Sequence, residues 1–357
     1  QFKDLKADSY ILDRIAELKE KLSDRVIILG HHYERDDVIQ FADIRGDSFK
    51  LAKEATKRDD KEFIVFCGVE FMAESADVVS SDFQKVIIPD VTAGCSLADF
   101  ASLENVESAW KEINSIINEK IIPITYINST AKLKSFVGKN GGSVCTSSNA
   151  SMIFDWAMEQ GEKIFFFPDQ YLGGNTAMQK GIDNDEIILW KRNEKYGGNS
   201  KKKIINAKVI LWDGYCSVHK RFSVSDIKKL REKYPEIKII SHPECNYEVI
   251  KNSDYAGSTG QIIQTIEDSA DGTIWGVGTE HHLVKRLQEL FPNKKVVSLS
   301  EVGYQCVTMS KNTPEKLLKV LENLDNGKVI NQVVVEDEVK KYAKISLDKM
   351  IEISSRK

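Results

Sequence analysis

The sequence repeats one unit three times. Each copy has an apolar strand ending in polar residues, a short hydroxyl-rich stretch, a second apolar strand, and a third strand that runs out into a cysteine. From the first polar strand end to the hydroxyl stretch the copies span 17, 21 and 16 residues, and from there to the end of the next strand 20, 21 and 20. Such regular self-similarity predicts three related domains.

The last step of each copy, from the second strand to the cysteine, takes 27, 48 and 28 residues. The excess in the second copy falls at about residues 179–203, which are charged and contain paired glycines. We expect this insertion to be a surface excursion that tolerates shortening. The landmarks that define the repeat are His31, Tyr33, Ser48 and Cys95; Tyr126, Asn128, Ser147 and Cys216; and His242, Glu244, Ser258, Thr259 and Cys306.

Short β-branched and aromatic runs alternate with helix-length segments, the pattern of βαβ units and parallel sheets. We therefore predict an α/β fold with domains at residues 1–104, 105–225 and 226–357, the first with an N-terminal helix and the last with C-terminal helices. The nine predicted strands lie within residues 25–33, 62–70, 85–90, 121–128, 163–170, 207–214, 236–244, 272–280 and 294–301.

Composition limits the classes of function. The chain is 41% hydrophobic and 29% charged with a net charge of −4, as in ordinary globular proteins. No apolar run approaches the roughly 18 residues of a membrane span, and the first residues form an amphipathic pattern rather than a signal peptide. Because no basic block is present either, we expect a cytoplasmic protein that binds neither membranes nor nucleic acid.

The six cysteines, at positions 67, 95, 145, 216, 245 and 306, include no close pair. Zinc ribbons and thioredoxin-type redox sites both require close pairs, so neither is predicted. In open α/β sheets functional groups gather beyond the carboxyl ends of the strands. If the three copies face one axis, Cys95, Cys216 and Cys306 converge there.

Three explanations fit these cysteines. They could hold a [4Fe–4S] cluster in which one iron lacks a protein ligand and acts as a Lewis acid. They could instead bind zinc together with His219, three residues after Cys216. All six could also be core thiols, because free cysteine is among the most buried residue types.

Two further motifs have a chemical and a structural explanation. The sequence His31-His32-Tyr33, combined with Glu244, offers groups for acid/base chemistry, but it could simply end a strand. The GSTG sequence at 257–260 precedes a helix-like segment and suits a phosphate or carboxylate, although a plain helix cap explains it equally well.

The motifs GHHYERDD, GVEFMAE, PDVTAGCSLAD, TYINST, VCTSSNA, PDQYLG, WDGYCSVH, SHPEC and DYAGSTGQ resemble, in order and over nearly the whole chain, those of the quinolinate synthase family. The resemblance implies three similar three-layer α/β/α domains around a pseudo-threefold axis. It also implies a transferase of NAD biosynthesis that condenses iminoaspartate with dihydroxyacetone phosphate to quinolinate, releasing phosphate and two waters. A partner implied in the same way is the L-aspartate oxidase that supplies iminoaspartate.

The resemblance assigns a role to each landmark residue. The cofactor would be a [4Fe–4S] cluster, with Cys95, Cys216 and Cys306 as its ligands. The catalytic residues would be Tyr33, Glu244, His31, His219 and His242. The substrate would be bound by His31, Ser48, Tyr126, Asn128, Ser147, His242, Glu244, Ser258 and Thr259.

Two other functions remain as alternatives at this stage. One is another iron–sulfur hydro-lyase that uses the same open-iron chemistry on a different hydroxy acid. The other is a non-enzymatic iron–sulfur redox sensor, which would not need the polar residues at the strand ends.

Overall fold

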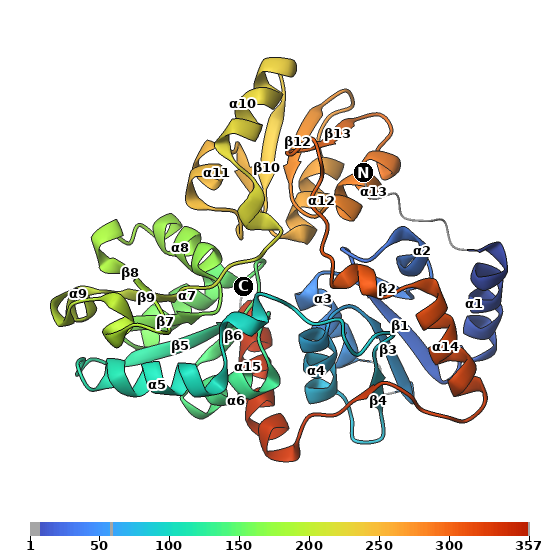
Figure 1. The fold of residues 1–357 in the computed structure, drawn as a ribbon, viewed down its shortest axis with the longest axis horizontal. Helices are drawn as coiled ribbons and strands as arrows, with labels where there is room; N and C mark the ends of the chain where they lie inside the picture. Colours follow the sequence, from blue (N-terminus) through green and yellow to red (C-terminus); the bar gives the residue numbers. More distant parts are fainter. Residues whose placement is uncertain (1–7, 58–59, 356–357) are drawn as a thin grey trace.

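The computed structural model of the protein describes residues 8–57 and 60–355. These residues form three mostly parallel sheets, each flanked by helices and each in a separate lobe (Figure 1). The predicted α/β fold is confirmed. Of the predicted N-terminal helix, the described part is α1 (Ser9–Lys21), and residues 1–7 lie outside the described residues.

The first sheet has the strand order β2-β1-β3-β4, with β14 added antiparallel to β4. Strand β1 is buried at all six positions and is apolar up to its last residue, His31, as a parallel strand covered on both faces requires. The strands are β1 (Val26–His31), β2 (Ile44–Gly46), β3 (Phe63–Cys67), β4 (Lys85–Ile87) and β14 (Gln332–Val333). The helices between them are α2 (Asp36–Ile39), α3 (Ser48–Ala55) and α4 (Glu70–Val79).

The second sheet has the order β6-β5-β7-β9-β8 and is parallel throughout. Its strands are β5 (Ile121–Tyr126), β6 (Ser143–Cys145), β7 (Lys163–Phe167), β8 (Ile187–Trp190) and β9 (Val209–Trp212). Its helices are α5 (Leu103–Asn114), α6 (Ala131–Lys139), α7 (Ala150–Gln160), α8 (Gln170–Gln179) and α9 (Lys201–Asn206).

The third sheet has the order β11-β10-β12-β13, also parallel. Its strands are β10 (Lys238–Ser241), β11 (Tyr255–Ala256), β12 (Ile274–Gly278) and β13 (Lys295–Ser298). Its helices are α10 (Val224–Lys233), α11 (Tyr247–Asn252), α12 (Thr259–Glu267) and α13 (His281–Leu290). All nine predicted strands are present, and the three sheets share one core order.

The loops that carry the predicted ligand cysteines repeat in detail. In each unit the cysteine carbonyl accepts a hydrogen bond from the backbone N–H four residues later, at 3.1 Å. A short 3-10 helix begins three residues after the cysteine: η1 (Ala98–Phe100), η4 (His219–Arg221) and η5 (Met309–Lys311). The spacing seen in the sequence therefore corresponds to one repeated local structure.

The end of the chain leaves the third lobe. Helix α14 (Pro314–Asp325) packs against α1, and β14 then joins the first sheet. Helix α15 (Asp337–Ser355) packs against α6 and also contacts α4 and α7, so it lies between the first and second lobes (Figure 1). We propose to keep domain divisions at about residues 104 and 225 and to assign residues 314–355 to the first two units.

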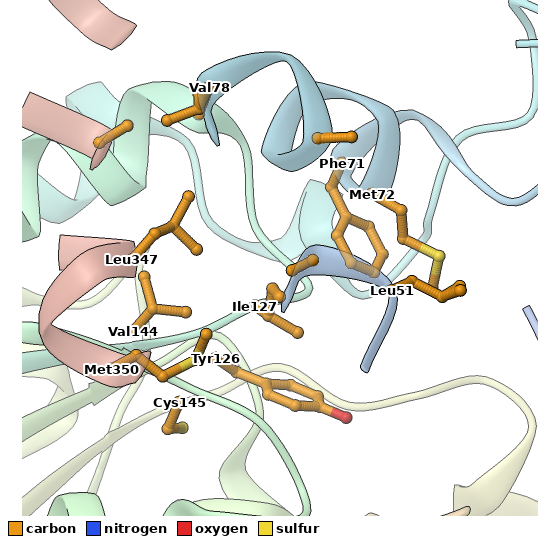
Figure 2. Packing of buried hydrophobic residues seen from close by; sticks show 14 of the residues in the cluster. Leu51, Phe71, Met72, Val78, Tyr126, Ile127, Val144, Cys145, Leu347 and Met350 are labelled. Carbon is orange, nitrogen blue, oxygen red and sulfur yellow. The ribbon is translucent and has the colours of Figure 1, made fainter. Parts of the chain in front are cut away.

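The largest apolar cluster joins these two units. Figure 2 shows Leu347 and Met350 of α15 beside Val144, while Phe71 comes from α4 on the facing side. Tyr126 lies at the edge of this cluster, and its hydroxyl points away from the apolar side chains. The apolar side chains of this cluster thus hold Tyr126, at the polar end of β5, in place.

The expectation that residues 179–203 form a surface excursion is wrong. Residues Ile187–Trp190 form β8, which pairs with β9 at the edge of the second sheet. Trp190 is only 2% exposed and belongs to a core cluster with Phe165 and Trp212. The apolar run at 187–190 was the signal for a strand, but the charged and glycine-containing residues around it obscured that signal.

Shortening or weakening this segment is therefore expected to destabilise the second unit. Replacing Trp190 by alanine removes a buried aromatic side chain and should lower the free energy of unfolding by about 3–5 kcal/mol. Chemical denaturation followed by circular dichroism measures this difference. Lys202→Ala, an exposed change in α9, should stay within about 0.5 kcal/mol of the wild type. Equal stability of the two variants would contradict the core role of Trp190.

Candidate active site

The carboxyl ends of the three sheets enclose one cavity with about 640 Å³ of space outside the protein atoms. The sequence predicts fourteen positions for this site, namely the thirteen landmark residues and His219. Thirteen of the fourteen line the cavity, and Ser258 is the exception. The thirteen are His31, Tyr33, Ser48, Cys95, Tyr126, Asn128, Ser147, Cys216, His219, His242, Glu244, Thr259 and Cys306.

The cavity separates the six cysteines into two groups. Cys95, Cys216 and Cys306 line it and are partly exposed, whereas the other three are buried. The loops of the first two units touch directly after their cysteines, where the hydroxyls of Ser96 and Ser217 are 3.2 Å apart. One thiol from each unit therefore faces a common space.

The thiols of this group are protonated in the absence of a metal. Burial, with a smaller contribution from the neighbouring Cys306, raises the pKa of Cys95 to about 12. Burial also raises the pKa of Cys216 well above its usual value. Metal ligation requires the thiolate, and the positive charge of a metal centre would favour loss of the thiol protons. The donor set fits a metal centre that takes one sulfur from each unit.

One compact group of donor atoms lies beside these thiols. Among the described residues, Cys216, His219 and Glu244 place one ligand atom each within 4.8 Å of the others, a geometry that could hold a metal ion. Neither Cys95 nor Cys306 belongs to this group. Zinc–sulfur bonds of about 2.3 Å would put the sulfurs of a tetrahedral site roughly 3.8 Å apart. Among the described residues, the three cysteines and His219 do not form one compact donor group of this kind.

Glu244 is the most strongly held acid/base group in the cavity. Its Oε1 accepts a short hydrogen bond from the Tyr126 hydroxyl, and its Oε2 lies 2.7 Å from His219 Nδ1. Burial raises the pKa of Glu244, but the neighbouring His219 and His242 and these hydrogen bonds outweigh it and bring the pKa well below its usual range. Glu244 is therefore a carboxylate at neutral pH.

Hydroxyl groups connect His219 to Tyr33 by hydrogen bonds. His219 Nε2 lies 3.1 Å from Thr279 Oγ1, and Thr279 Oγ1 lies 2.8 Å from the Tyr33 hydroxyl. The Thr259 hydroxyl donates to the same tyrosine oxygen at 3.0 Å. Burial and the charge of Glu244 raise the pKa of Tyr33 well above its usual value, so the phenol keeps its proton. Side chains from all three units form one hydrogen-bonded chain.

His31 and His242 have equivalent surroundings. In each case the backbone N–H two residues later donates to the ring Nδ1, at 3.1 Å from Tyr33 and 3.3 Å from Glu244. Burial, more than any neighbouring charge, lowers the pKa of each histidine to about 3. A neutral ring whose Nδ1 accepts a bond carries its proton on Nε2. Both histidines therefore offer an N–H donor rather than a positive charge.

The hydroxyl stretches of the repeat lie at the starts of helices. Ser48 is the first residue of α3, Ser147 lies shortly before α7, and Thr259 is the first residue of α12. Helix N-termini favour anions, because their first N–H groups have no partner within the helix. The cavity is thus bordered by three helix starts with hydroxyl side chains.

Ser258 differs from the other predicted residues. Its hydroxyl accepts the backbone N–H of Gln261, and the Gln261 side chain accepts the N–H of Ser258. This capping box accounts for the GSTG sequence by local structure. The predicted contact of Ser258 with substrate stays a prediction.

The sequence analysis missed several residues of the site. Thr279 connects Tyr33 to His219, and Thr308 Oγ1 lies 3.4 Å from Cys306 Sγ. Phe71 and Met309 line the cavity as apolar residues. Met309 follows Cys306 by three residues, as His219 follows Cys216, so the repeat itself contained the signal for this position.

A cavity that brings together buried acid/base groups and metal-type ligands, at the carboxyl ends of parallel strands, is characteristic of an enzyme active site. Comparison with known proteins identifies the family. The family model for quinolinate synthetase A protein (NadA) matches residues 13–352. The chain belongs to this enzyme family.

Individual relatives agree with this assignment. The chain is 49% identical over 345 residues to the quinolinate synthase of Herpetosiphon aurantiacus, covering 96% of this chain and 92% of that protein. It is 47% identical over 348 residues to the quinolinate synthase of Corynebacterium glutamicum, covering 97% and 88%. The family resemblance seen in the sequence motifs is confirmed. In the described part of the chain, every helix is too short or too polar to span a membrane.

Proposed function

We propose that the protein catalyses the condensation of iminoaspartate with dihydroxyacetone phosphate to quinolinate, releasing one phosphate and two waters. The observation that supports this most directly is the single cavity that unites three cysteines, three helix starts and the Tyr33–His219–Glu244 chain. Membership of the quinolinate synthetase A family supports it independently. The function belongs to NAD biosynthesis, and we place the protein in the cytoplasm.

We infer that Cys95, Cys216 and Cys306 hold a [4Fe–4S] cluster. Three sulfur donors from three separate loops leave one iron of such a cluster without a protein ligand. When bound, the cluster supplies a Lewis acid that assists the loss of hydroxide. Cys95, Cys216 and Cys306 come from three different units and line the same cavity, which supports this choice.

The anionic groups of the substrates match the helix starts. Iminoaspartate carries two carboxylates and the triose carries a phosphate, and all three need hydroxyl and N–H donors. Ser48, Ser147 and Thr259 offer these at three different places on the cavity wall. Asn128 also lines the wall, and its buried Oδ1 has no hydrogen-bond partner in the described part of the chain. A bound substrate N–H or hydroxyl would satisfy it.

Proton transfer falls to the hydrogen-bonded chain. The Glu244 carboxylate can accept a proton, while the neutral phenol of Tyr33 can donate one. His219 contacts Glu244 through Nδ1 and the hydroxyl of Thr279 through Nε2, so it connects these two groups. His31 and His242 orient substrate oxygens through Nε2–H. Iminoaspartate is unstable in water, so an L-aspartate oxidase that supplies it is the partner we propose.

Anaerobic turnover tests the proposed function. Protein reconstituted with iron and sulfide is given dihydroxyacetone phosphate and freshly generated iminoaspartate, and quinolinate and phosphate are quantified by chromatography. We expect one phosphate for each quinolinate. Protein with a full cluster that forms no quinolinate would contradict the proposal. Dehydration of another hydroxy acid would then indicate a hydro-lyase, and loss of all turnover with an intact redox response would indicate a sensor.

A further inference from the structure

In each unit one helix begins beside the cysteine loop. These helices are α4, which follows β3, α8, which follows β7, and α13, which follows β12. The first backbone N–H of α4, α8 and α13 donates to the carbonyl two residues before the cysteine, at 2.8, 2.9 and 2.9 Å. The residue just before the helix differs between the units: it is Val69, Asp169 and Glu280. In two of the three units a carboxylate therefore lies next to a predicted metal ligand.

Glu280 connects the start of α13 to Cys306. It is fully buried, and its Oε2 accepts the backbone N–H groups of His282 at 2.8 Å and Leu283 at 3.4 Å. Its Oε1 accepts the backbone N–H of Cys306 at 3.2 Å and lies 2.8 Å from His282 Nδ1. One side chain thus holds a helix start and a cysteine at the same time.

Asp169 has the same position in the second unit. It is also fully buried, and its Oδ1 accepts the N–H groups of Tyr171 at 2.7 Å and Leu172 at 2.8 Å. Burial and the charge of Glu244 raise the pKa of Asp169 well above its usual value, and the nearby backbone N–H groups, that of Cys216 among them, oppose this shift only in part. The Oδ2 of Asp169 is buried and has no hydrogen-bond partner among the described residues.

We propose that Glu280 and Asp169 are positioning residues for the metal centre: Glu280 holds Cys306 through the cysteine's backbone N–H, and Asp169 has the equivalent place before α8, beside the loop of Cys216. The inference deepens the proposed function and rests on a cluster bound by Cys95, Cys216 and Cys306. Hydrogen bonds to a charged acceptor are stronger than those between neutral groups. Residues that orient metal ligands affect metal affinity nearly as much as the ligands themselves do.

The first unit offers the matched control. Val69 cannot accept a hydrogen bond through its side chain, and Glu70 at the start of α4 is exposed. The Cys95 loop is held elsewhere, by Asp90, whose Oδ1 accepts the backbone N–H of Thr92 at 2.8 Å. Glu70→Gln therefore makes the same chemical change as Glu280→Gln, at the equivalent helix, away from any ligand.

The test compares full-length Glu280→Gln, Asp169→Asn and Glu70→Gln with the wild type after anaerobic reconstitution. We expect an iron chelator to remove the cluster about 10- to 100-fold faster from the first two variants, and at the wild-type rate from Glu70→Gln. We also expect a more positive midpoint potential in Glu280→Gln, because loss of a nearby negative charge favours reduction. A purely structural role would not shift the potential.

The amide side chains keep one oxygen that accepts the helix N–H groups, and circular dichroism of the metal-free variants verifies the fold. If one variant fails to fold, the other tests the same idea in a different unit, and failure of both would overturn the proposal. Wild-type chelation rates and potentials in both variants would also overturn it, yet leave the proposed function intact. Wild-type protein that binds no iron would instead contradict the proposed function.

Discussion

Changing Cys95, Cys216 or Cys306 singly to serine is expected to abolish the brown iron–sulfur absorbance of the anaerobically purified protein and to reduce turnover to near zero. Each of these thiols belongs to a different unit and faces the common cavity, so none can replace another. Serine retains the size of the side chain but does not supply a thiolate. Iron and sulfide analysis, together with the visible spectrum, measures the loss.

The other three cysteines provide the matched controls. Cys67, Cys145 and Cys245 are buried and lie outside the cavity lining, so their serine variants should keep most of the cluster. A buried hydroxyl reduces stability, so circular dichroism should accompany the iron analysis. Full cluster content in Cys306→Ser would refute the convergence of the three loops on one metal centre.

The fold was predictable from the sequence because each copy of the repeat shows the same apolar strand patterns at similar spacings. Nine apolar runs became the nine expected strands, since buried parallel strands need continuous apolar sequence. The short strands β2, β6 and β11 were missed, because two or three residues give no periodic signal. The placement of α14 and α15 on the first two units depends on long-range packing, which local patterns do not encode.

The site residues that were predictable are those at equivalent positions in the three copies of the repeat. The cysteines and polar strand ends were found by comparing copies, since equivalent strand ends meet at one place. Thr279 and Glu280 were not found, because a threonine or glutamate at the start of a helix is an ordinary cap by sequence. Only their bonds to Tyr33, His219 and Cys306 distinguish them.

The second large effect is expected at the two ends of the hydrogen-bonded chain. Tyr33→Phe and Glu244→Gln should keep the cluster but lower turnover by about 10²–10⁴-fold, the usual contribution of one acid/base group. Phenylalanine removes only the hydroxyl that contacts Thr279 and Thr259. Glutamine has nearly the same volume as glutamate but carries no charge, whereas the lowered pKa of Glu244 makes the wild-type side chain a carboxylate at neutral pH.

Rates and cluster content should be measured on the same preparations, because a lost cluster would also stop turnover. Tyr255→Phe and Glu248→Gln, two exposed changes in the third unit, should leave both quantities unchanged. A fall in kcat with little change in KM would assign Tyr33 and Glu244 to the chemical steps, because transition-state interactions alone are then lost. Near-normal rates in both variants would mean that the chain from Thr259 to Tyr126 holds the three units together and moves no proton.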